Sequence, residues 1–235
     1  AHGGVKNWSS AFLPAEFQGT PLGVASQPAT SAGVAYTHNK RITRKQQRLQ
    51  LDLMTQANQE HLKLTGPNQA LEGRISSFEL AFRMQSRIPE IVDIADESKQ
   101  TLAMYGLDEE ITQDFGRQCI LARRFAEAGV RFIQITHSDS NVQWDQHSDL
   151  VKGHTKNALE VDKPIAALLT DLKQRGLMED TLVLWGGEFG RTPVMQGSNG
   201  RDHNPEGFTM WMAGGGVKGG YQYGTTDEYG YFAQT

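Results

Sequence analysis

One short apolar run, residues 181–185 with the sequence Thr-Leu-Val-Leu-Trp, constrains the fold more than any other stretch of the chain. Its side chains do not alternate between apolar and polar, which is typical of a strand covered on both faces of a parallel sheet. The glycine pair that follows relaxes the backbone, so that Glu188 and Arg191 can project beyond the end of the strand. We therefore expect a central strand with an acid and a base at its carboxyl edge, where open α/β sheets build their sites.

Two earlier segments complete a strand, helix, strand unit that ends on this run. Residues 130–136 carry the apolar pattern of a buried strand, and a long helix is expected from about Val151 to Arg175. Pro164 predicts a kink or a break near the middle of this helix. A further apolar strand is expected at residues 208–216. Because strands joined through a helix are almost always parallel, we predict an α/β fold with a mostly parallel sheet flanked by helices.

Upstream of this unit the sequence is mostly helical. The first predicted helix spans residues 43–64 and ends at a Gly-Pro pair. A second begins with Ser76 or Ser77 as its N-cap and is interrupted at Pro89. A third covers residues 111–128 and ends at a glycine. These helices are expected to pack together as a cap.

The chain is accordingly divided into three parts. Residues 1–41 are rich in Gly, Ser, Thr, Pro and Ala and form a loop-rich segment that aromatic side chains pin to the body. Residues 42–128 form a helical subdomain, and residues 129–235 form the α/β core.

Composition excludes two classes of partner. The net charge of -4 and the pI near 6.0 give no electrostatic footprint for nucleic acid. No apolar run approaches the roughly 18 residues that a membrane span needs. The only cysteine, Cys119, excludes an internal disulfide and is expected to be a small buried residue on a helix.

Polar side chains follow the predicted strands, and the predicted topology brings their loops to one edge of the sheet. Histidine and carboxylate side chains are ligands for zinc, with manganese or calcium as alternatives. The candidate ligands are His137, Asp145, His147, Glu188, Asp202 and His203. Simpler interpretations stay open, because a loop histidine is usually only solvated, Glu188 can pair with Arg191, and Asp202 can cap a turn.

Several stretches closely resemble one family. Residues 144–150, 164–193 and 200–231, and with them 7–22 and 76–90, are similar to the family catalogued as domain of unknown function 1501. That family is related to the alkaline phosphatase and sulfatase superfamily. The resemblance implies an alkaline-phosphatase-like, or sulfatase-like, fold that hydrolyses or transfers phosphate or sulfate esters at one or two metal ions.

The resemblance also assigns roles. Asp145 and His147 stand where an Asp and His pair of metal ligands falls, although their spacing is shorter than the usual Asp-x-x-x-His. Glu188 occupies the strand end that commonly supplies an Asp-His pair, and His203 matches the last metal histidine. Arg191 would bind the anionic group of the substrate in a bidentate manner.

In the superfamily the nucleophile comes from an N-terminal strand, and nothing before Trp8 can supply it here. We therefore expect a fragment that lacks its N-terminal part and its C-terminal end, and that is inactive alone. Two hypotheses follow. The first is a metal-dependent hydrolase of small-molecule or polysaccharide esters, and the second is a non-catalytic binding or structural protein with a structural ion or none. Relatives with export signals suggest a periplasmic or secreted protein, with a cytoplasmic location left open.

Overall fold

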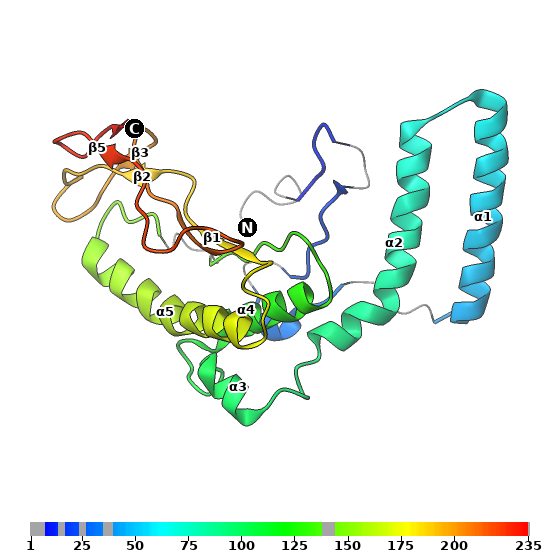
Figure 1. The fold of residues 1–235 in the computed structure, drawn as a ribbon, viewed down its shortest axis with the longest axis horizontal. Helices are drawn as coiled ribbons and strands as arrows, with labels where there is room; N and C mark the ends of the chain where they lie inside the picture. Colours follow the sequence, from blue (N-terminus) through cyan, green and yellow to red (C-terminus); the bar gives the residue numbers. More distant parts are fainter. Residues whose placement is uncertain (1–7, 14–16, 24–26, 35–39, 138–143, 235) are drawn as a thin grey trace. The chain divides into compact units, whose positions relative to one another are not determined.

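The computed structural model describes residues 8–13, 17–23, 27–34, 40–137 and 144–234. The chain divides into two compact units, Ala1–Asp96 and Glu97–Thr235, shown in Figure 1. The division into three segments at residues 41 and 128 stays a prediction. Among the described residues, no helix combines the length and apolarity needed to cross a membrane.

The first unit contains a 3-10 turn, η3 (Ala29–Ser31), and two long helices, α1 (Arg44–Thr65) and α2 (Gln69–Val92). A capping box starts α1: the Thr43 side chain accepts a hydrogen bond from the Gln46 N–H, and the Gln46 side chain accepts one from the Thr43 N–H. The helix ends at Gly66, whose φ of 87° lies in the left-handed region. The predicted first helix is therefore confirmed.

The predicted start of the second helix at Ser76 or Ser77 is wrong. The helix begins earlier because the Asn68 side chain caps it by accepting from the Leu71 N–H. Ser77 lies inside the helix and its hydroxyl donates back to the Gly73 carbonyl, at 2.8 Å. Pro89 falls in the last turn, so α2 continues three residues past it to Val92.

The second unit contains α3 (Lys99–Met104), α4 (Gln113–Glu127) and α5 (Leu150–Gln174). The predicted helices at residues 111–128 and from about 151 to 175 are confirmed as α4 and α5. Pro164 is buried and α5 runs through it as one helix. The core of this unit lies between α4 and α5, and Cys119 is buried in it as expected. Its buried apolar residues include Tyr105, Phe115, Cys119, Ile120, Leu121, Phe125, Val161, Leu168 and Leu172.

The strands of this unit form three antiparallel pairs. They are β1 (Leu182–Trp185) with β4 (Trp211–Gly214), β2 (Gly190–Arg191) with β3 (His203–Asn204), and β5 (Thr225–Thr226) with β6 (Ala233–Gln234). The predicted α/β class, with a mostly parallel, alkaline-phosphatase-like sheet flanked by helices, is therefore wrong. Every sheet among the described residues has only two strands, and their partners run in opposite directions.

Two physical reasons explain the error. Residues 130–136 form no strand, and the first of them belongs to the end of α4, because the Val130 N–H donates to the Phe125 carbonyl at 3.0 Å. The run at 181–185 does form a strand, but it pairs with β4 as a ribbon, with Leu184 opposite Met212. Leu182 and Leu184 are 53% and 56% exposed, so the absence of alternation does not mark burial on both faces.

Candidate metal centre

Two loops of the second unit are joined next to the start of α5. The Leu150 N–H donates to the Asn199 carbonyl at 3.1 Å, and the Arg201 N–H donates to the Gln146 carbonyl at 3.0 Å. Gly200 makes this close approach possible, because a Cβ there would lie 1.9 Å from the His147 carbonyl oxygen. Residues 145–150 and 199–203 are thus held together although they are about 50 positions apart.

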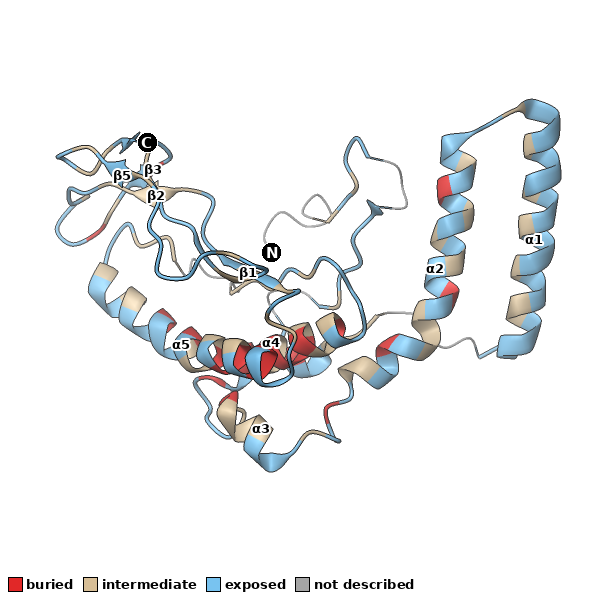
Figure 2. Ribbon diagram, viewed as in Figure 1, coloured by how far each residue is buried: buried red, intermediate tan, exposed pale blue. Residues whose placement is uncertain are grey.

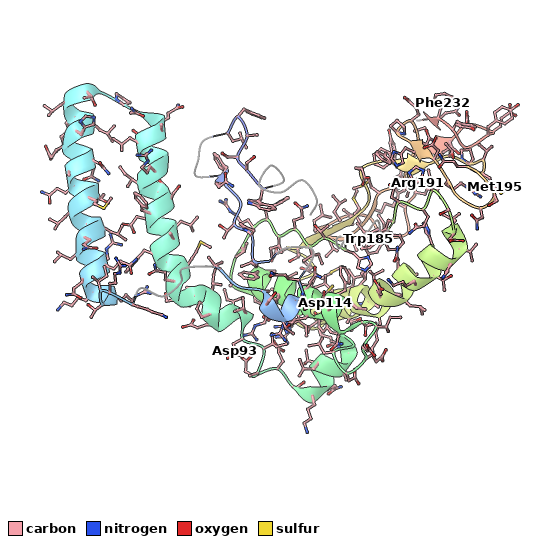
Figure 3. All side chains as sticks on the ribbon, turned by 180° about the vertical axis from the view of Figure 1, so that it is seen from behind. Asp93, Asp114, Trp185, Arg191, Met195 and Phe232 are labelled. Carbon is pink, nitrogen blue, oxygen red and sulfur yellow. The ribbon has the colours of Figure 1, made fainter. Side chains whose placement is uncertain are left out.

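The short β2–β3 ladder adds a third segment to the site. It pairs Arg191 with His203, so that the two residues are neighbours across the strands. The turn is fixed by the Thr192 N–H, which donates to the Asp202 carbonyl at 2.9 Å, and by the Asp202 N–H, which donates to the Thr192 hydroxyl at 3.1 Å. Figure 3 marks Arg191 on this hairpin and Trp185 at the end of β1.

Asp145, His147 and His203 bring one ligand atom each to a single place. The Asp145 Oδ1 lies 2.8 Å from the His203 Nε2 and 2.9 Å from the His147 Nε2, and the two Nε2 atoms are 3.2 Å apart. The described residues contain one group of this kind, with all its ligand atoms within 4.8 Å of one another. Tetrahedral ligands about 2.0 Å from zinc are about 3.3 Å apart, so the spacing is already close to what an ion requires.

A hydrogen bond to Gln196 fixes which ring nitrogen of His147 faces the cluster. The His147 Nδ1 lies 2.5 Å from the Gln196 Oε1, which is an acceptor, so Nδ1 is the donor nitrogen and Nε2 is the nitrogen that faces Asp145. The Nε2 atom faces the Asp145 carboxylate oxygen at 2.9 Å, a place where either a proton or a metal ion can lie between the two atoms. The donor set of two imidazole nitrogens and one carboxylate oxygen is one that zinc uses.

Arg191 lowers the pKa of the acid in this cluster. Burial alone would raise the pKa of Asp145, but hydrogen bonds from Arg191 and His203 and the positive charge of Arg191 outweigh it, so the pKa lies below its ordinary value. The guanidinium of Arg191 donates to the same Oδ1 that faces the two histidines. Phe189 packs against the His203 ring, with ring centroids 4.4 Å apart. The carboxylate is therefore available as a ligand near neutral pH.

The other three predicted ligands lie outside the cluster. His137 uses both ring nitrogens elsewhere, at 2.8 Å from the Glu160 Oε2 and at 2.9 Å from the Trp144 Nε1. The Asp202 Oδ1 accepts from the His203 N–H at 2.8 Å and lies 4.0 Å from the His147 Nδ1, so it caps the turn beside the site. Glu188 is exposed in the turn after β1.

Two contributors were not found from the sequence. Gln196 orients His147 from 49 positions away, and Glu160 binds His137 from the middle of α5. Neither lies in a local pattern that marks it. The sequence offers only a general indication. A helix follows the loop that carries the histidine, and a glutamate on that helix can contact the histidine.

Comparisons with known proteins complete the description of the chain. No curated protein and no solved structure matches it. One family, described as protein of unknown function (DUF1501), matches residues 1–235. That description names no activity, so the relation to the alkaline phosphatase and sulfatase superfamily stays a prediction. Because the match runs from the first residue to the last, the chain belongs to the DUF1501 family.

Proposed function

We propose that Asp145, His147 and His203 bind one divalent cation, with zinc as the first choice, at the centre of a hydrolase of phosphate or sulfate esters. The observation that carries this proposal is the convergence of three ligand atoms within 4.8 Å from two separate loops. The loops are far apart in sequence, and backbone hydrogen bonds between them hold the arrangement.

The exposure of the cluster favours catalysis over a structural ion. Structural zinc sites have four protein ligands and are closed, whereas catalytic sites have three and keep one position open. The side chains of Asp145, His147 and His203 are 35%, 42% and 43% exposed, so one side of the cluster faces solvent. A substrate can therefore reach it. The alternative, a non-catalytic member of the family with a structural ion, has no such observation in its favour.

Arg191 gives the site its preference for anions. Its guanidinium is planar and can donate two parallel hydrogen bonds to a phosphate or sulfate group. The side chain is only 21% exposed and already reaches the Asp145 carboxylate, so its charge lies beside the ligand atoms. When bound, a divalent ion supplies Lewis acidity toward an ester oxygen and lowers the pKa of a water. Phosphate or sulfate esters of small molecules or polysaccharides are the proposed substrates.

The first test is metal content and zinc affinity of the purified chain, by elemental mass spectrometry and calorimetric titration. Asp145→Ala and His203→Ala should each lose the ion, and His61→Ala, an exposed histidine on α1, should keep it. Hydrolysis of p-nitrophenyl phosphate and p-nitrophenyl sulfate is then measured on the product of the full-length gene, in which Arg191→Ala should weaken turnover without removing the ion. A parent chain that binds no zinc, manganese or calcium would contradict the proposal.

A further inference from the structure

His137 and Trp144 are tied to each other seven positions apart in the sequence. The indole Nε1–H of Trp144 donates to the His137 Nδ1 at 2.9 Å. An indole nitrogen can only donate, so the His137 Nδ1 must be an acceptor and must carry no proton. In the neutral ring the proton therefore sits on Nε2.

That proton has a partner on α5. The His137 Nε2 lies 2.8 Å from the Glu160 Oε2, and the Lys156 Nζ lies 3.6 Å from the other oxygen of the same carboxylate. The side chains of His137 and Glu160 are only 9% and 17% exposed, so their hydrogen bond is shielded from water. Trp144, His137 and Glu160 form a continuous chain of donors and acceptors, called here the Trp-His-Glu relay.

Aromatic contacts fix the same residues. The Trp144 ring meets the His154 ring edge-on at 5.4 Å and the Trp185 ring at 6.3 Å. The His137 ring meets the Phe115 ring of α4 edge-on at 5.2 Å. Trp144 is thus anchored on α5 and on the end of β1, and the residue after it is Asp145.

We infer that the Trp-His-Glu relay is a positioning device for the metal ligands, and that His137 acts in it rather than as a ligand itself. By holding Trp144, the relay sets the direction in which the next residue, Asp145, presents its carboxylate to His203. None of the three relay residues touches a ligand atom, so each acts through Asp145. This inference rests on the proposed metal site.

The main variant is Trp144→Phe, which removes the donor and keeps an aromatic ring against His154 and Trp185. Its control is Trp8→Phe, a partly exposed tryptophan of the first unit. Zinc affinity by calorimetry should fall about tenfold in Trp144→Phe, as is usual when a partner that orients a ligand is lost, and should not change in the control. Thermal unfolding of the metal-free variants shows whether either one has lost its fold.

A second readout needs no metal. The protein has 4 tryptophans, so the ¹⁵N-tryptophan spectrum contains few indole resonances, and the one that is missing in Trp144→Phe belongs to Trp144. In the parent protein, the indole N–H proton of Trp144 should exchange slowly with solvent. His137→Phe should make that resonance exchange quickly and should weaken zinc binding as much as Trp144→Phe does. Glu160→Gln keeps an acceptor for the His137 Nε2–H, so it should restore most of what Glu160→Leu loses.

The outcomes separate the two proposals. If the Trp144 indole proton exchanges slowly but the parent protein binds no metal, the proposed metal site is contradicted. The relay would then only join two segments of the chain. Unchanged zinc affinity in Trp144→Phe and His137→Phe, with binding intact in the parent, would overturn the positioning role and leave the metal site standing. A rapidly exchanging indole in the parent would overturn the relay itself.

Discussion

The helix pairs of the two units hold together by different means. α4 and α5 bury apolar side chains from both helices, and seven of the residues of α4 are buried. α1 is longer than α4, yet none of its residues is buried, as the colours of Figure 2 show. Its contacts with α2 include Arg48, which donates twice to Glu79, and the guanidinium groups of Arg44 and Arg48 over the Phe82 ring.

The ionic contacts of the two pairs differ in the same way. Arg123 of α4 is 2% exposed and meets Glu97 at 2.7 Å and Asp171 at 2.9 Å, and these two acids are 6% and 5% exposed. Arg48 is 32% exposed and its partner Glu79 is 30% exposed. A helix can therefore form from its own caps and propensities, but a shared core and buried charges make a pair of helices hard to separate.

The largest expected change in stability follows from removal of the buried cation, Arg123. Arg123→Leu removes the most buried cation of this network and leaves Glu97 with Arg124, and Asp171 with Arg175 and Tyr105. The loss of the buried charge should lower the free energy of unfolding by about 3–5 kcal/mol. Urea denaturation followed by circular dichroism measures the change. Arg48→Leu is the matched variant of the exposed pair and should produce a much smaller shift. Equal shifts would show that burial does not distinguish the two networks.

Core truncation should have the next largest effect. Leu172 is 1% exposed on α5, so Leu172→Ala should cost about 2–5 kcal/mol of unfolding free energy. Leu53 is 58% exposed on α1, and Leu53→Ala should stay within about 0.5 kcal/mol of the parent. The midpoints of thermal unfolding compare the two variants. A large loss in Leu53→Ala would mean that α1 is covered in solution.

The smallest expected effect is a pH dependence of the α1–α2 pair. The hydrogen bond from Arg48 lowers the pKa of Glu79 and outweighs the opposing effect of burial. A lowered folded-state pKa stabilises the pair above the unfolded value of about 4.3, and this contribution is lost as the pH falls through the lower folded value. Helical circular dichroism should therefore decline from about pH 4 downward. Glu79→Gln should remove that part of the decline, and an unchanged profile in the variant would contradict the assignment.

The sequence predicted what local chemistry decides. The Gly-Pro pair after α1 and the glycine after α4 act within a few residues, so the ends of these helices were found. The start of α2 was missed because Asn68 and Ser76 are both plausible caps, and only the fold selects between them. Strand pairing is decided by distant segments, so the direction of β1 was predicted wrongly.

The candidate site shows the same division. Asp145, His147 and His203 were proposed from their types and loop positions, and the structure brings them together, although through an antiparallel hairpin instead of a parallel sheet edge. His137 looked equivalent in the sequence. Its partners, Trp144 and Glu160, draw it away from the cluster, and a pairing over 23 residues has no local signature.

The close approach at Gly200 has a practical consequence for anyone who modifies this protein. A single added methyl group would collide with the His147 carbonyl oxygen at 1.9 Å, and would have to push the two loops apart. Alanine at this position would therefore act as a wedge that loosens the cluster while every ligand keeps its own chemistry. Gly200 therefore controls the spacing of the ligand atoms, although it has no side chain that could contact them.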